Sequence, residues 1–392
     1  MTAEELTRRG FLGAVGAVVA GAVAPGVALA RFGSADSRPP APGPRPPVAG
    51  DPRPAGAAMP PGAASASPVA PADPRETRLR NLRQLTFGGQ NAEAYFSADG
   101  RRLIFQSTRD GRACDQIHTM HADGTDVRLV STGQGVTTCG FFFPDRPRLL
   151  YASTHLGGAA CPPRPAPAGG YAWALHPDYE IFSADLDGGN VVRLTHNPGY
   201  DAEAAVSPDG KRIVFTSLRG GDLDLYLMDA DGGNVRRLTT DYGYDGGPFF
   251  SWSGKHIVYR AFHPRTEAER ARYTADLAQN LFRPTWLELF LMNADGAGRR
   301  QVTQLGAASF APFSHPDDRR IIFASNVHDP AGRSFALYLV NVDGTGLERI
   351  TFAETFASFP MFSADGRRLV FASNRGAARP REFNVFLADW AD

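Results

Sequence analysis

Six copies of one strand-turn-strand pattern follow residue 78 and constrain the fold more than any other feature of the chain. The clearest copy runs Ala205-Val-Ser-Pro-Asp-Gly-Lys-Arg-Ile-Val-Phe-Thr-Ser217 and continues from Leu223 to Thr239. Asp-Gly between apolar runs is a strong hairpin signal, because both residues tolerate the positive φ that tight turns require. Four short strands in each unit of roughly 40 to 50 residues are typical of a propeller blade.

The turns mark the length of each copy. The first turns lie at Asp99-Gly100, Asp145-Arg146, Asp209-Gly210, Ser253-Gly254, Asp317-Asp318 and Asp365-Gly366. Their separations are 46, 64, 44, 64 and 48 residues, so copies two and four carry insertions. The second turns lie at Asp123-Gly124, Asp187-Gly188, Asp231-Gly232, Asp295-Gly296 and Asp343-Gly344.

The last copy lacks its fourth strand, and a matching strand lies at the other end of the repeat region. The copy ends at Asn384 to Trp390, whereas Asn81-Leu-Arg-Gln-Leu-Thr86 reads like the closing strand Asn234-Val-Arg-Arg-Leu-Thr239. Adding this early strand to the last blade closes the ring and removes an exposed sheet edge. We therefore predict an all-β fold for residues 79–392, a six-bladed β-propeller closed by an N-terminal strand. An irregular β-sandwich array or an open repeat stack is the alternative.

The residues before the repeats predict export. Arg8-Arg9 with Phe11-Leu12, an apolar run and Ala28-Leu-Ala30 indicate a twin-arginine signal peptide at residues 1–30. The run is short and rich in Gly and Ala, too weakly apolar for a membrane span, although a retained anchor is the alternative. Residues 31–78 are rich in Pro, Ala and Gly and predict a disordered tether. We expect a periplasmic or secreted protein.

Composition limits the partners. The chain has 41 basic and 41 acidic residues without a long block of one sign in the repeats, which argues against nucleic acid. A repeat region of this length can bury a self-sufficient core. We expect a monomer without a cofactor.

Both insertions fall on one face of the predicted propeller. In this fold the short first and second turns share one face, called the turn face below. The loops between second and third strands and the links between blades share the other, called the upper face. Insertions at Thr154–Asp178 and Phe262–Thr285 therefore both belong to the upper face. The second contains a predicted short helix with Thr266 as its N-cap, either a cap on blade four or a lid.

Ionisable side chains gather at the upper face. The acidic candidates, at the starts of inner strands, are Glu93, Asp201, Glu203 and Asp245, and the histidine candidates, at the ends of second strands, are His155, His263 and His328. Oxygen ligands from several blades suit calcium and imidazoles suit a transition metal. The alternative is that the acids accept backbone hydrogen bonds and the histidines face water. Because no pair has the spacing of ligands on a helix, the metal is left unknown.

The cysteines and the aromatic residues of the upper face can each have a structural or a functional role. A disulfide between Cys139 and Cys161 would pin the blade-two insertion onto its own blade in an exported protein. The alternative is a catalytic thiol, but no His or Asn has the spacing that would support this role. Trp173, with Tyr171, Tyr179 and Trp286, either forms a stacking platform for a ligand or anchors its loop.

The repeat in residues 209–217 and 223–232 resembles the repeats of TolB-like, WD-repeat-like propeller proteins of bacterial envelopes, and the resemblance covers residues 79–392. It implies the fold, whereas such repeats serve unrelated functions. TolB itself carries an α/β domain before its propeller and binds envelope proteins, but here only the tether precedes the repeats. Propellers of prolyl-oligopeptidase-type enzymes are similar, yet the Gly-x-Ser-x-Gly of their hydrolase domain is absent. Propeller lyases acting on oligogalacturonate use histidines and a metal, but the histidines here do not reproduce their motif.

These features predict an exported, non-catalytic propeller that binds an envelope protein, a peptide or a glycan through its upper face. The residues expected to contact the ligand are the seven ionisable candidates and Trp173. The alternative is a metal-dependent lyase or hydrolase that uses the upper-face carboxylates and histidines.

Overall fold

The computed structural model describes residues 73–163, 171–353 and 355–392. The predicted signal peptide at residues 1–30 and nearly all of the predicted tether lie outside the described residues. Among the described residues, no helix has both the length and the apolar character needed to cross a membrane.

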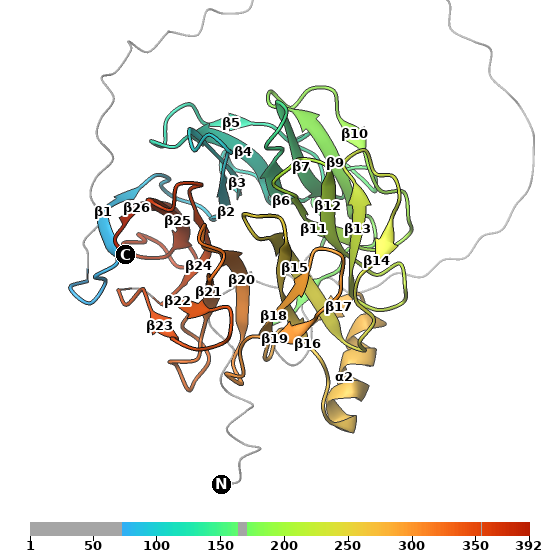
Figure 1. Ribbon diagram of the computed structural model, residues 1–392. Coiled ribbons are helices and arrows are strands. Elements are labelled where there is room, and N and C mark those ends of the chain that lie inside the picture. Colours follow the sequence, from blue (N-terminus) through green and yellow to red (C-terminus); the bar gives the residue numbers. More distant parts are fainter. Residues whose placement is uncertain (1–72, 164–170, 354) are drawn as a thin grey trace, which may run out of the picture. The chain divides into compact units, whose positions relative to one another are not determined.

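Within these residues, six four-stranded antiparallel sheets form the six blades of a propeller (Figure 1). Blade one contains β2 (Asn91–Phe96), β3 (Arg102–Ser107), β4 (Gln116–His121) and β5 (Arg128–Leu129). Blade two contains β6 (Thr137–Phe142), β7 (Arg148–Ser153), β9 (Glu180–Asp185) and β10 (Val192–Arg193). Blade three contains β11 (Asp201–Val206), β12 (Arg212–Ser217), β13 (Asp224–Asp229) and β14 (Arg236–Arg237).

The other three blades repeat this order. Blade four contains β15 (Tyr244–Phe250), β16 (His256–Phe262), β18 (Glu288–Asn293) and β19 (Arg300–Gln301). Blade five contains β20 (Ser309–Ser314), β21 (Arg320–Ser325), β22 (Ala336–Asn341) and β23 (Glu348–Arg349). Blade six contains β24 (Ala357–Phe362), β25 (Arg368–Ser373), β26 (Asn384–Trp390) and, from the other end of the repeat region, β1 (Leu79–Gln84).

The core lies between neighbouring blades. The middle strands are covered on both faces, so they consist of continuous apolar runs rather than alternating ones. Leu103, Ile104 and Phe105 in β3 are fully buried, as are Leu369, Val370 and Phe371 in β25.

The Thr or Ser that ends each repeat has the same structural role in all six blades. Its hydroxyl accepts a hydrogen bond of 2.9 to 3.0 Å from the second backbone N–H of the third strand. The donor and acceptor pairs are Ile117 to Ser131, Ile181 to Thr195, Leu225 to Thr239, Leu289 to Thr303, Leu337 to Thr351 and Val385 to Thr86. The sixth pair joins the two ends of the ring, because Thr86 follows β1.

Ring closure by the N-terminal strand is confirmed. β1 pairs antiparallel with β26, from Leu79 opposite Trp390 to Gln84 opposite Phe386. Figure 1 shows blue β1 beside red β26, so the two ends of the repeat region share one sheet. Blade six therefore has four strands like the others, and its third strand is not an exposed edge.

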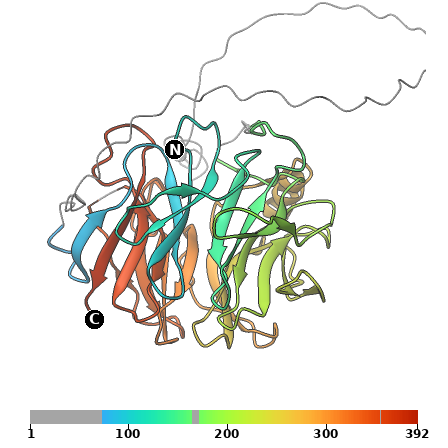
Figure 2. The same ribbon diagram turned by 90° about the horizontal axis from the view of Figure 1, so that it is seen from above.

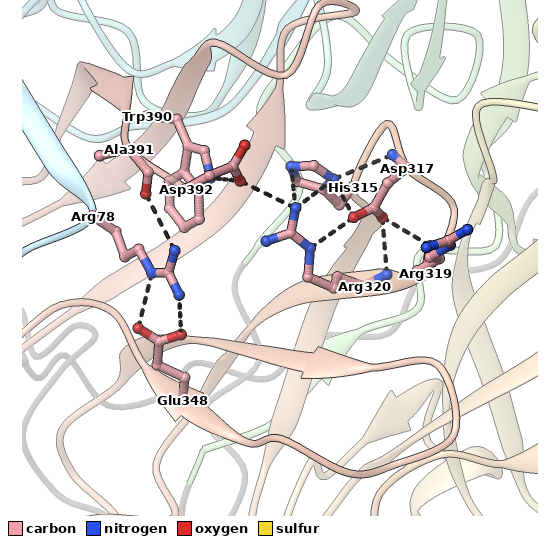
Figure 3. Close-up of polar contacts among 9 residues, drawn as sticks. All are labelled: Arg78, His315, Asp317, Arg319, Arg320, Glu348, Trp390, Ala391 and Asp392. Carbon is pink, nitrogen blue, oxygen red and sulfur yellow. Dashed lines mark hydrogen bonds and ion pairs between the residues drawn. The ribbon is translucent and has the colours of Figure 1, made fainter.

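Residues just before β1 strengthen this closure. Glu76, three residues before the predicted boundary at residue 79, forms a buried ion pair of 2.8 Å with Arg375. Arg78 donates two hydrogen bonds of 3.0 Å to Glu348 in blade five (Figure 3). The C-terminal Asp392 is also held by blade five, through Arg320 at 3.1 Å (Figure 3).

The two insertions meet on the upper face, as predicted. Between blades two and four, β8 (Trp173–Ala174) pairs antiparallel with β17 (Leu281–Phe282). The helix α2 (Glu267–Leu277) begins with Thr266 as N-cap, in a capping box with Glu269. Figure 2 shows α2 and the C-terminus toward opposite ends of the sheets, consistent with a C-terminus at the turn face.

Candidate functional site

A ring of six bulged residues surrounds the upper part of the propeller axis. Every inner strand has a register shift against its second strand. At each shift one residue has φ between 50° and 56°, namely Glu93, Cys139, Glu203, Gly247, Ala311 and Phe359. A β-bulge bends the strand and redirects the side chain at that position. We call these six residues the axial ring.

Glu203 is the most extensively bonded member of the axial ring. Its carboxylate accepts hydrogen bonds from the hydroxyls of Thr216 and Tyr244 and from the backbone N–H of Gly247, at 2.8 to 3.2 Å. It also forms an ion pair with the buried Arg260. Because Glu203 and Thr216 belong to blade three, whereas Tyr244, Gly247 and Arg260 belong to blade four, this network joins two blades.

Arg260 connects this network to the insertions. Its guanidinium occupies the space that a side chain at Gly247 would need, which explains the glycine at this position of the ring. The ring of Trp173, from β8, lies with its centroid 4.9 Å from the guanidinium carbon. Trp173 therefore anchors its strand above the axial ring and remains partly exposed there.

Glu93 and Cys139 form the other polar part of the axial ring. The Cys139 thiol lies close enough to Glu93 to favour its carboxylate form. Burial raises the pKa of Glu93 to about 7, against the opposing effects of Cys139 and the charge of Arg260. Burial, and then the charges of Glu93 and Glu203, raise the pKa of Cys139 well above its ordinary value. The thiol is therefore neutral near pH 7 and a poor nucleophile.

Two predicted ligand residues, Asp201 and Asp245, do not line the upper end of the axis. Both are fully buried at the starts of inner strands. Asp201 forms an ion pair of 2.9 Å with Arg219, and Asp245 lies 3.0 Å from His263. The same strand position carries a hydrogen-bonding side chain in other blades, for example Thr137, which bonds to Ser153. Both acids make these contacts within their own blades.

The three predicted histidines stay apart. His155 bonds to Ser153 and packs on Phe182 within blade two, with ring centroids 4.4 Å apart. His263 contacts Asp245 in blade four, and His328 lies near Tyr338 in blade five. Among the described residues, no three His, Cys, Asp or Glu side chains are grouped so as to hold a metal ion.

The predicted disulfide is wrong in one partner. The structure bridges Cys161 to Cys114, with Cα atoms 5.9 Å apart, and leaves Cys139 as a free thiol. The reason is geometric, because Cys139 belongs to the axial ring whereas the blade-two insertion reaches the β3–β4 loop of blade one. The bridge therefore ties two blades together rather than pinning the insertion to its own blade.

A row of phenylalanines beside the axial ring was not predicted. Phe310, Phe335, Phe356 and Phe383 are all partly exposed, on or just before strands of blades five and six. Successive ring centroids are 5.2, 6.3 and 5.5 Å apart, and Phe310 also lies 5.8 Å from Phe359 of the axial ring. We call these four residues the phenylalanine row.

An alignment of the repeats contains the signal for this row. The residue before the third strand is Leu223 in blade three and Leu287 in blade four, and both are fully buried. In blades five and six the same position holds Phe335 and Phe383. Each of the four makes a parallel bridge to a residue at or just before the start of the next inner strand. Phe335 and Phe383 are partly exposed at a position that is buried in blades two, three and four, where it holds Tyr179, Leu223 and Leu287.

Comparisons with known proteins agree with the fold. A family model described as TolB beta propeller domain matches residues 158–274. A protein assigned as TolB from Agrobacterium tumefaciens has 18% identity and a TM-score of 0.52, over 78% of this chain and 91% of its own. TolB from Acinetobacter baumannii has 17% identity and a TM-score of 0.51, over 77% of this chain and 64% of its own.

A more distant likeness carries no inference about this chain. Oligogalacturonate lyase from Vibrio parahaemolyticus has 14% identity and a TM-score of 0.47, over 79% of this chain and 93% of its own. At these identities the solved structures show the fold alone. The family model over residues 158–274, the fold of the two TolB structures and the six closed blades agree on a six-bladed β-propeller similar to that of TolB.

Proposed function

We propose that this chain is an exported, non-catalytic binding protein that holds a protein or peptide segment at the upper end of the propeller axis. The observation that carries the proposal is the phenylalanine row beside the axial ring. Partly exposed aromatic side chains in contact with one another are typical of protein-binding surfaces, where they bury much apolar area with little loss of side-chain entropy.

The polar side of the same surface suits a positively charged group of the partner. Glu93 forms no ion pair with a basic side chain among the described residues, and burial raises its pKa to about 7. A lysine, an arginine or an amino terminus placed beside it would favour the carboxylate. The expected ligand therefore combines apolar side chains for the phenylalanine row with one cationic group for Glu93.

The bonding of the ring residues supports binding rather than catalysis. The carboxylate of Glu203 is already bonded to four donor residues, and Cys139 is a neutral thiol. The three candidate histidines, His155, His263 and His328, lie in three different blades. Neither an activated nucleophile nor an acid and base pair facing a common point is present in the described part of the chain.

The cellular setting of this proposal comes from the sequence. The twin-arginine pattern before residue 31 and the likeness to TolB propellers both favour a periplasmic or secreted protein acting as a monomer. We therefore expect the partner to be a protein or peptide of the cell envelope. Of the three ligand classes predicted from the sequence, we favour a protein or peptide over a glycan, because the exposed row consists of phenylalanine.

The test compares binding by three forms of the chain. The full chain, the double variant Phe335→Ser with Phe356→Ser, and the control Leu347→Ser are immobilised and exposed to envelope extract. Leu347 is an exposed apolar residue that follows a turn on the other face. Captured proteins are identified, and synthetic peptides from them are titrated against each form.

We expect at least one peptide to bind equally well to the wild-type chain and to Leu347→Ser. The double variant should bind this peptide at least tenfold more weakly, because each of the two phenylalanines contributes more than about 1 kcal/mol. Glu93→Gln should weaken binding only of peptides that carry a positive charge. Equal capture by all three forms would refute the proposal. Turnover of a polysaccharide or peptide that is lost in Glu203→Ala or His328→Ala would show an enzyme instead.

A further inference from the structure

A second candidate site lies on the turn face, away from the axial ring and unrelated to the proposed function. A cavity of about 680 Å³ opens at the seam between blade six and blade one. It is lined by Arg83 from β1, residues 99–102 from the β2–β3 turn and the start of β3, residues 121–123 at the end of β4, and Arg368 from β25. Small-molecule sites in proteins have volumes in this range.

The lining is rich in basic side chains that lack partners. The side chains of Arg83, Arg101 and Arg102 form no hydrogen bond or ion pair with any residue that the structure describes, and Nε of Arg83 is buried without a partner. Arg368 donates a hydrogen bond of 2.8 Å to the carbonyl oxygen of Gly100, which fixes its position across the seam.

The acidic lining residues are used by their own turns. Asp99 accepts hydrogen bonds from the Ser97 hydroxyl and the Arg101 backbone N–H. Asp123 accepts from the backbone and the hydroxyl of Thr125. Four arginines against two aspartates leave an excess of positive charge around the cavity.

A comparison of the blades shows how blade one differs from the rest. Each second strand begins with a basic residue, and an acid faces it across the sheet in blades two, three and six. These pairs are Arg148 with Asp185, Arg212 with Asp229 and Arg368 with Asp389. In blades four and five the facing residue is Asn293 or Asn341. Only in blade one, among these six blades, is it a histidine, with Arg102 facing His121.

The acid next to His121 is already engaged by another arginine. Asp126 lies 3.6 Å from Nε2 of His121, but it also forms an ion pair of 2.8 Å with Arg128. By contrast, Arg148 in blade two bonds directly to the acid opposite, at 2.6 Å. Blade one thus leaves Arg102 without the carboxylate that its counterpart has.

From this arrangement we infer that the seam cavity binds a phosphate-bearing molecule, with Arg83, Arg101 and Arg102 as its main donors. Guanidinium groups match the oxygens of a phosphate in geometry and charge, and hydrogen bonds between charged groups are about twice as strong as neutral ones. The volume exceeds the needs of a single phosphate ion, so the expected ligand has a second phosphate or an organic group. The source is either a soluble phosphorylated compound or the head group of a lipid.

The experiment measures binding of defined probes to the full chain at low ionic strength. Inorganic phosphate and pyrophosphate are titrated by calorimetry, and sedimentation is measured with phosphatidylcholine vesicles that contain or lack phosphatidylglycerol. Each probe is tested on the wild type, Arg102→Gln, His121→Asp and Arg212→Gln. The His121→Asp substitution gives blade one the facing acid of blades two, three and six, so we expect it to fold with an unchanged or higher Tm.

We expect saturable binding of one pyrophosphate per chain, weakened roughly tenfold or more by Arg102→Gln and by His121→Asp. Arg212→Gln, the matching position of blade three, should bind like the wild type. The same pattern of variants with phosphatidylglycerol vesicles alone would support the site and identify a lipid head group as the source. No binding of any probe, or binding that all variants retain, would overturn the inference.

Discussion

At the scale of single residues, the clearest consequence of the axial ring is an unusual glutamate. Glu93 has a pKa of about 7, raised mainly by burial from an ordinary value of 4.5. Between pH 4.5 and about pH 7, Glu93 is protonated in the folded chain and ionised in the unfolded chain. The free energy of unfolding therefore falls as the pH rises through this range. The loss is at most on the order of 3 kcal/mol, since each pKa unit corresponds to about 1.4 kcal/mol.

The prediction is tested by urea unfolding of the wild type and Glu93→Gln at pH 5 and pH 8. The wild type should lose more free energy of unfolding between these pH values than the variant, whose amide does not titrate. An equal loss in both proteins would show that another group dominates, and the assignment of the raised pKa to Glu93 would be wrong.

The sequence could predict some residues of the axial ring but not the rule that selects them. Glu93 and Glu203 were predicted as acids at the starts of inner strands and Cys139 only as a disulfide partner, whereas Asp201, two positions from Glu203, is fully buried. The difference arises from the bulge, which redirects the third residue of the strand, and a local pattern does not reveal a bulge. Arg260 was missed because it reaches the ring from a neighbouring strand through the space left by Gly247.

At the scale of elements, the loops of the upper face determine how the blades are joined. The bridge between Cys114 and Cys161 closes a loop of 47 residues that includes all of β4, β5, β6 and β7. Restricting a loop of this length in the unfolded chain stabilises the fold by up to about 4 kcal/mol. Cys161→Ser should therefore lower the free energy of unfolding by a similar amount, measured under oxidising conditions.

The control for this prediction is Cys139→Ser, which leaves the bridge intact. It should unfold close to the wild type, and peptide mapping without reductant should give a fragment linking Cys114 to Cys161 in both. A fragment linking Cys139 to Cys161 would contradict the structure. The sequence could not decide between these pairings, because repeat spacing places strands but not the path of an insertion between blades.

At the scale of the whole molecule, the fold was predictable because the sequence pattern of a blade recurs six times. Five copies carry both turns and a closing Thr or Ser, and the sixth takes its closing strand and Thr86 from the start of the repeat region, so a misreading of one copy is corrected by the others. The site is not repeated. The phenylalanine row, the axial ring and the seam cavity depend on differences between blades, and these become visible only when equivalent positions are compared.

Ring closure is the property on which the whole molecule depends, and truncation tests it. Removing residues 1–87 deletes β1 together with Glu76 and Thr86, whereas removing residues 1–72 leaves every one of these contacts. The first truncation also loses three buried leucines, Leu79, Leu82 and Leu85, which contribute about 6 kcal/mol together by burial alone. Free energies of unfolding are typically about 5 to 15 kcal/mol, so this loss is a large part of the total.

We therefore expect the chain without residues 1–72 to unfold in urea at the wild-type midpoint and to elute as a monomer. The chain without residues 1–87 should unfold at a much lower midpoint and associate, because the unpaired edge of β26 is then available to another molecule. Equal midpoints for the two truncations would mean that β1 adds no stability and that the five complete blades hold the ring together without it.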